Sequence, residues 1–106
     1  MSLKSVDSNG FKEEVVDESD LVFSFWWASW CTACKSMENT IKELSEEVSD
    51  IKFVGVNVDR NREIADQYNI RGVPSFLIFK DGELVDRDVA AKTKKQLKEM
   101  IKEAKK

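Results

Sequence analysis

Two cysteines separated by two residues, Cys31 and Cys34, are the residues of this sequence best suited to chemistry. They are the chain's only cysteines, and the chain has no histidine. A disulfide needs Cα atoms about 4.4–6.8 Å apart, and one helical turn brings residues three positions apart close to this range. A bridge over so small a loop constrains the unfolded chain very little. It is therefore better suited to a redox switch than to a structural staple.

The two cysteines are expected to differ in reactivity. Cys31 stands at the start of a predicted helix, where free backbone N–H groups and the positive end of the helix dipole favour a thiolate. Lys35 adds a nearby positive charge. Cys34 lies one turn further on and should be more shielded. We therefore expect Cys31 to attack a substrate disulfide and Cys34 to resolve the mixed disulfide.

Two other interpretations of the cysteine pair stay open. Zinc needs four ligands, so a site built on two cysteines would require a second copy of the chain. Alternatively, the cysteines stay reduced and only fill space. The missing histidine removes Ser-His-Asp triads, Cys-His pairs and histidine metal sites. We expect no metal, and no cofactor beyond the redox-active pair. The acidic residues Asp17, Glu18 and Asp20 are expected to form loop surface.

The elements that must position the pair follow from apolar periodicity. Short β-prone runs predict strands at 21–27, 53–58, 75–79 and 83–89. Helical spacing predicts helices after Asn9, along Met37–Val48, around Ile64–Tyr68 and after Thr93.

Local signals refine the expected boundaries. Asn9 is the expected cap of the first helix, and Thr93 with Gln96 forms a capping box at the last one. Asp81-Gly82 is the preferred pair for a two-residue hairpin turn.

The order of elements predicts an α/β fold in one domain spanning residues 1–106. Strands that alternate with helices imply parallel strands joined by crossovers, and the hairpin adds one antiparallel pair. The result is a mixed sheet with helices on both faces. In such sheets the sites lie outside the carboxyl ends of the strands, and the cysteines follow strand 21–27 there.

Composition narrows the class of protein. The 106 residues are 42% hydrophobic and 35% charged, with a net charge of −3, which is typical of a globular domain. This mild negative charge argues against nucleic acid and against an anionic membrane surface. No apolar run approaches the roughly 20 residues of a spanning helix. Met1-Ser2-Leu3-Lys4 shows no signal-peptide pattern. We therefore expect a cytoplasmic protein, and the alternative is a protein whose leader has been removed.

Three segments together resemble the thioredoxin family over nearly the whole chain. They are Phe25–Lys35, Arg71–Ser75 and Phe79–Glu83, and their order and spacing match the family. The resemblance implies a thioredoxin-like fold and a protein-disulfide reductase with Cys31 as nucleophile and Cys34 as resolving thiol. It also implies disulfide-containing protein substrates, an electron donor of the thioredoxin-reductase type and a monomeric state.

The resemblance also assigns a substrate groove. Trp30 would line it, Trp27 would pack beside the site, and Val73 would offer backbone hydrogen bonds to a substrate strand. The Val73–Pro74 bond would be cis, and Ala90 stands where the family usually has glycine. Without the resemblance, Pro74 would be a trans turn proline and the tryptophans plain core or surface residues. The expected substrate-binding residues are Trp30, Thr32, Ala33, Gly72, Val73, Pro74 and Ala90, supported by Phe25, Trp27 and Lys35.

The chain departs from the family pattern at three places. Thr32-Ala33 replaces the usual Gly-Pro, Phe25 replaces a buried aspartate, and Gly55 replaces its lysine partner. The Ala33 N–H, which a proline would lack, is expected to donate to the Cys31 thiolate. Losing the buried carboxylate removes repulsion on that thiolate. We therefore expect a more acidic Cys31, a weaker reductant and slower resolution by Cys34.

Two alternative functions stay open at this point. Cys-Thr-Ala-Cys-Lys is similar to the C-terminal domain of periplasmic transmembrane electron-relay reductases, which would make the chain a specialised electron relay. A thioredoxin-like domain can also serve only for binding, with the groove around Trp30 and Pro74 holding an extended segment.

Overall fold

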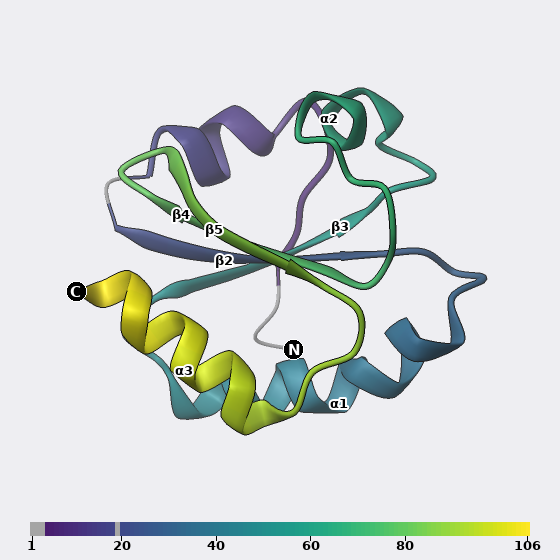
Figure 1. Ribbon diagram of the computed structural model, residues 1–106. Coiled ribbons are helices and arrows are strands. Elements are labelled where there is room, and N and C mark those ends of the chain that lie inside the picture. The colour runs from purple at the N-terminus through teal and green to yellow at the C-terminus, as the bar shows by residue number, and fades with distance from the viewer. Residues whose placement is uncertain (1–3, 19) are drawn as a thin grey trace.

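A five-stranded sheet forms the middle layer of the protein, as the computed structural model shows for residues 4–18 and 20–106 (Figure 1). Its strands are β1 (Lys4–Ser5), β2 (Leu21–Trp27), β3 (Lys52–Asn57), β4 (Ser75–Lys80) and β5 (Glu83–Val89), in the spatial order β1-β3-β2-β4-β5. The helices α1 (Thr32–Glu47) and α3 (Lys94–Lys105) cover one face, and the π-helical turn η1 (Lys12–Val16) and α2 (Arg62–Gln67) cover the other. The expected α/β fold with a mixed sheet is confirmed. The expectation about a leader rests mainly on Met1–Leu3, which lie outside the described residues.

The direction of β4 differs from the expectation. β3 is parallel to β2, but β4 is antiparallel to β2 as well as to β5. The 16-residue α1 is about 24 Å long and returns the chain to the start of the sheet. The six-residue α2 is only about 9 Å long, less than half of a six-residue strand. The chain therefore enters β4 from the end where β3 stops.

The hairpin between β4 and β5 is confirmed at Asp81 and Gly82. Both residues have positive φ, 51° and 81°, as a two-residue turn of this kind requires. A Cβ at position 82 would collide with the carbonyl oxygen of Val16. Glycine is thus needed there both for the turn and for the close approach of η1.

Two features at the N-terminal edge were not predicted correctly. The strand β1 pairs with β3, Lys4 opposite Val54, but it has two exposed residues and no alternation to reveal it. The first helix is a single π-helical turn whose N-cap residue is Phe11, so the cap expected at Asn9 is wrong. Instead, Asp7 Oδ1 accepts the Gly10 N–H at 2.8 Å.

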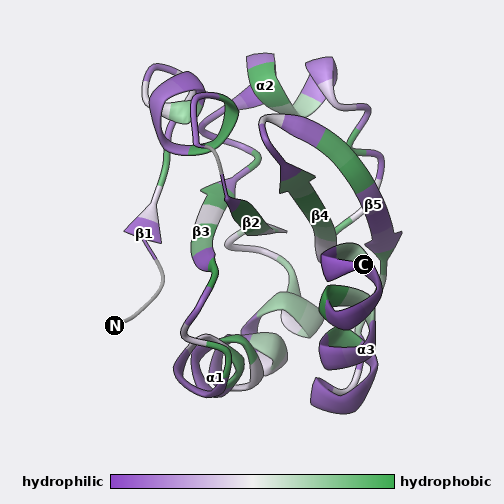
Figure 2. Cartoon of the chain, turned by 90° about the vertical axis from the view of Figure 1, so that its left-hand side faces the viewer, coloured by the Kyte–Doolittle hydropathy of each residue, from purple (hydrophilic) through white to green (hydrophobic). Residues whose placement is uncertain are grey.

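Alternate residues of β2 enter two separate cores. Phe23 and Phe25 face α1 and α3, whereas Val22 and Trp26 face η1 and α2. Figure 2 shows apolar residues on the inner strands and hydrophilic residues on the outer surfaces of the helices. The predicted apolar face of α1 is confirmed, with Met37, Ile41 and Leu44 buried against the sheet.

One polar residue interrupts the apolar run of β2 without leaving an unsatisfied group. Ser24 Oγ donates to the Leu77 carbonyl at 2.8 Å and accepts the Trp26 indole N–H at 2.7 Å. Buried polar atoms need such partners. The serine therefore fixes Trp26 in the core that faces α2.

The far end of α1 is tied to α3 by ion pairs. Glu47 accepts hydrogen bonds from Lys94, at 2.6 Å, and from Lys98, which lower its pKa to about 2. Asp50 accepts a further bond from Lys105 at 2.7 Å, and this bond lowers the pKa of Asp50. α1 is thus held at its C-terminal end, while its N-terminal end carries the cysteines.

Candidate active site

Cys31 and Cys34 form a disulfide where the chain passes from β2 into α1, as predicted. Their Cα atoms are 5.2 Å apart, within the range that a disulfide allows. Cys31 is the N-cap residue of α1, with extended backbone (φ −89°, ψ 108°). Its Sγ accepts the Cys34 N–H at 3.1 Å. The sulfur of Cys31 therefore occupies the place where a helix normally holds a capping oxygen.

The hydrogen bond to Cys31 Sγ comes from a backbone N–H in the first turn of α1. An N-cap side chain accepts from the second or third N–H of the helix. The third N–H, that of Cys34, is the one that reaches Cys31 Sγ in the disulfide form. The bond expected from the Ala33 N–H concerns the reduced Cys31 thiolate and stays a prediction. Thr32 and Ala33 are exposed at the surface of the first turn.

The two sulfur-bearing residues differ slightly in exposure. Cys31 is 6% exposed and Cys34 is 2% exposed, and both join the core between the sheet and α1. Beside them Trp30 is 67% exposed, the most open large apolar residue of the described chain. A partner would therefore meet Trp30 and Cys31 before it could reach Cys34.

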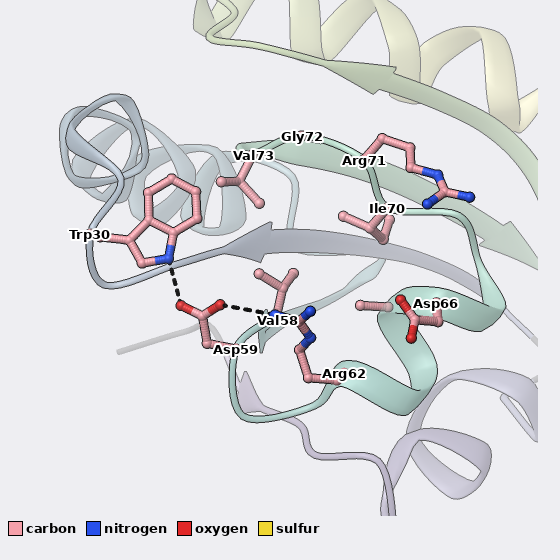
Figure 3. A pocket seen from close by; sticks show the side chains of 10 residues that line it. Trp30, Val58, Asp59, Arg62, Asp66, Ile70, Arg71, Gly72 and Val73 are labelled. Atoms are coloured by element: carbon pink, nitrogen blue, oxygen red, sulfur yellow. Dashed lines mark hydrogen bonds and ion pairs between the residues drawn. The ribbon is translucent and has the colours of Figure 1, made fainter.

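Trp30 is held over a pocket of about 300 Å³ (Figure 3). Its indole N–H donates to Asp59 Oδ2 at 2.6 Å, and Asp59 Oδ1 lies 3.8 Å from Arg62 Nη1. Gly72 and Val73 line the same pocket, so the structure brings two of the predicted groove residues to Trp30. Sequence reasoning missed Asp59. The available signal was a polar residue just after the buried strand β3.

We expect Asp59→Ala to weaken substrate binding. Without its acceptor, the exposed indole is no longer fixed, so KM for a protein disulfide should rise about three- to tenfold, with kcat changed less than about twofold. Steady-state kinetics measure both constants. Asp66→Ala is the matched control, because Asp66 lines the same pocket without bonding Trp30. An equal change in both variants would contradict the role given to the hydrogen bond.

The Val73–Pro74 peptide bond is cis, as the resemblance implied. Pro74 is buried, and Gly72 and Val73 are half-buried. Ser75 Oγ donates to the Gly72 carbonyl at 2.5 Å, and the Ala90 N–H donates to the Pro74 carbonyl at 2.9 Å. Ala90 is therefore attached to the proline loop. The backbone bonds expected from Val73 to a substrate stay a prediction.

Ala90 adopts a backbone conformation that favours glycine, with φ of 74°. A Cβ in this region costs about 1 kcal/mol. Ala90→Gly should therefore stabilise the oxidised protein by up to about 1 kcal/mol, less the entropy that glycine adds to the unfolded chain. Urea unfolding of the two proteins measures this difference. A destabilised glycine variant would show that the methyl group makes a compensating contact.

The supporting residues surround a hollow of about 340 Å³ beside Cys34. Phe25, Trp27 and Lys35 line it as predicted neighbours of the site, and Glu38 was not predicted. The fourth residue after Cys34 lies one turn further along the same face of α1, which was the available signal. Lys35 lines this hollow together with Cys34.

The two departures from the family pattern in the sheet are direct neighbours. Phe25 on β2 is paired with Gly55 on β3. Phe25 is 2% exposed and stacks on Phe76 with ring centroids 5.9 Å apart. A buried carboxylate at one position would need a cation at the other. Their joint replacement leaves this part of the core apolar.

Metal binding and membrane insertion receive no support from the described residues. Within 4–18 and 20–106, no three His, Cys, Asp or Glu side chains come together as a metal site. In the same ranges no helix has the length and apolar character needed to cross a bilayer. Two of the acidic loop residues form surface ion pairs, Asp17 with Lys12 and Glu18 with Lys52.

Comparisons with known proteins agree with this geometry. The family model described as Thioredoxin matches residues 2–103. Thioredoxin 1 of Synechococcus elongatus is 42% identical over 88 residues, which cover 82% of each chain. Thioredoxin of Pyropia yezoensis is 40% identical over 98 residues, or 92% of each chain. Thioredoxin of Bacillus subtilis is 33% identical over 102 residues, covering 95% of this chain and 96% of the relative. The chain therefore belongs to the thioredoxin family of protein-disulfide oxidoreductases.

Proposed function

We propose that this protein reduces disulfides in other proteins, with Cys31 as the attacking thiolate and Cys34 as the resolving thiol. The observation that carries the assignment is the position of Cys31 Sγ as the N-cap of α1. There the N–H groups and the positive end of the helix dipole favour a thiolate. The exposed Trp30 stands beside this sulfur, whereas Cys34 is nearly fully buried.

The reaction transfers two electrons in two steps. The Cys31 thiolate attacks one sulfur of the substrate disulfide, forms a mixed disulfide and displaces the other substrate sulfur as a thiolate. Cys34 then loses its proton and attacks Cys31 Sγ. The Cys31–Cys34 bond forms, and the second substrate sulfur leaves as a thiolate. The substrate is reduced and the protein reaches the disulfide state. The chemistry uses no metal or further cofactor.

The groove beside Trp30 would bind the protein substrate. An extended substrate segment would lie across Trp30 and the Gly72–Pro74 loop, with the Val73 backbone as its hydrogen-bonding partner. Thr32, Ala33 and Ala90 would border it. We further propose that the protein works as a monomer in the cytoplasm. An electron donor of the thioredoxin-reductase type would restore the dithiol.

The redox potential of the pair, measured by equilibration with glutathione, tests the proposal together with insulin disulfide reduction. We expect turnover, with a potential less reducing than the value of about −270 mV typical of thioredoxin. A more reducing value with rapid turnover would keep the function but overturn the effect given to Thr32-Ala33 and Phe25. No insulin reduction in the presence of a dithiol would overturn the function.

A further inference from the structure

Among residues 4–18 and 20–106, no buried residue is a carboxylate that could accept the proton of the resolving thiol Cys34 from the sheet side. The residue that faces it from β2 is Phe25, and Gly55 stands opposite Phe25 on β3. Ala28 and Met37 belong to the same apolar core as Cys34. A thiol must lose its proton to act as a nucleophile. The proton of Cys34 must therefore leave in another direction.

The hollow beside Cys34 offers that direction. With a volume of about 340 Å³, it has room for several water molecules, each of which takes about 30 Å³ in the liquid. The lining residues from β2 and the loop after it carry no titratable group. Besides Cys34, the titratable residues that line the hollow are Lys35 and Glu38, both from α1. Lys35 has no lone pair to offer as an ammonium ion. Glu38 is the carboxylate in the hollow.

Glu38 is also free of competing partners. Among residues 4–18 and 20–106, no ion pair or side-chain hydrogen bond involves its carboxylate, whereas Glu43 and Glu47 on the same helix pair with Lys94. Glu38 follows Cys34 by four residues, and side chains at this spacing are neighbours on a helix. Its oxygens can therefore be joined to the Cys34 thiol by a single chain of water.

We propose that Glu38 accepts the proton of Cys34, through water in this hollow, as Cys34 attacks Cys31 Sγ. The proposal deepens the proposed function and rests on it. As the Cys31–Cys34 bond forms and the substrate sulfur departs as a thiolate, the thiol proton moves to water and the water's proton to the carboxylate. The carboxylic acid then releases its proton to solvent through the open side of the hollow. Lys35 stabilises the thiolate that develops at Cys34.

The two steps can be timed separately with dithiobis-nitrobenzoate in stopped-flow mixing. Reduced protein releases one coloured thionitrobenzoate when Cys31 attacks, and a second when Cys34 closes the disulfide. The second phase is recognised because its rate is independent of reagent concentration. Glu38→Gln should slow this phase at least about tenfold near pH 7, as loss of a general base does, with the first phase changed less than about twofold.

The pH profile adds a second signature. With Glu38 present, the rate of the second phase should vary little between about pH 6 and pH 8, because the reaction then does not depend on Cys34 thiolate formed beforehand. In Glu38→Gln the rate of the second phase should rise about tenfold per pH unit, because only Cys34 that is already a thiolate reacts. Glu38→Asp should recover part of the rate. Glu46→Gln is the matched control, since Glu46 is exposed on the same helix and does not line the hollow.

Other results of these experiments would contradict the role proposed for Glu38. If Glu38 acted only through its charge, its removal would ease ionisation of Cys34 and speed the second phase. A faster or unchanged second phase, or an equal slowing of both phases, overturns the proposal. Absence of the first phase in the unmodified protein would instead overturn the proposed function itself.

Discussion

Cys31→Ser is expected to lower the rate of insulin disulfide reduction at least about a thousandfold. A serine hydroxyl does not ionise near neutral pH, and it forms no stable bond to sulfur that Cys34 could resolve. The fold should survive, because serine is itself a preferred N-cap residue and can accept the N–H that Cys31 accepts now. Insulin reduction and unfolding in urea measure activity and stability of the same sample.

Cys34→Ser gives the matched comparison. Cys31 can still attack, but nothing resolves the mixed disulfide, so a covalent adduct of protein and substrate should accumulate and be visible by mass spectrometry. If adducts formed on Cys34 in the Cys31→Ser variant as fast as on Cys31 in the Cys34→Ser variant, the separate roles given to the two residues would be wrong. Insulin reduction retained in Cys31→Ser would show that Cys31 is not the nucleophile.

Phe25→Asp should destabilise the protein by at least about 3 kcal/mol. The change removes a buried aromatic ring, which alone costs about 3–5 kcal/mol, and adds a carboxyl group to an apolar core. Phe25 is 2% exposed and loses its stacking on Phe76. Urea unfolding of both redox forms measures the loss.

The same substitution should change the chemistry in a defined direction. A carboxylate below the pair should raise the pKa of the Cys31 thiol and accept the proton of Cys34, so that closure of the disulfide becomes faster. The pH dependence of Cys31 alkylation and the second thionitrobenzoate phase report these effects. No change in either would contradict the role given to Phe25.

The pairing of Phe25 with Gly55 provides the control. In Phe25→Asp with Gly55→Lys, the new lysine and the new aspartate occupy directly paired positions on β3 and β2. The pair should recover about 1–3 kcal/mol relative to the sum of the single changes. Additive losses would show that the two positions do not interact.

The parts of the fold predicted from sequence are those fixed by local periodicity. The spacing of Met37, Ile41 and Leu44 reveals α1, and Asp81-Gly82 reveals the hairpin, because each signal lies within a few residues of its effect. The cysteine pair could be placed for the same reason. Its position follows from a strand that ends and a helix that begins nearby.

The features that sequence did not reveal depend on contacts between distant segments. β1 is defined only by its pairing with β3, and the direction of β4 depends on how far α2 carries the chain. Asp59 reaches Trp30 across 29 positions of sequence. Glu38 gains its proposed role from a hollow whose other wall is β2. Of these relations, only the four-residue spacing of Glu38 from Cys34 leaves a periodic signal in the sequence.

Because Cys31 caps α1, the redox state of the cysteine pair and the conformational stability of the chain are thermodynamically linked. Oxidised and reduced chains, each folded or unfolded, form a closed square. The difference between the two unfolding free energies must therefore equal the difference between the potentials of the folded and unfolded dithiols, with 30 mV corresponding to about 1.4 kcal/mol. If the Cys31 sulfur caps α1 better as a thiolate than as part of the disulfide, the reduced chain is the more stable one. The potential of the folded pair then rises by the equivalent amount, and the protein is a weaker reductant. Substitutions in the first turn of α1 that change the stability of the two redox forms unequally therefore change the potential, even where they never touch the substrate.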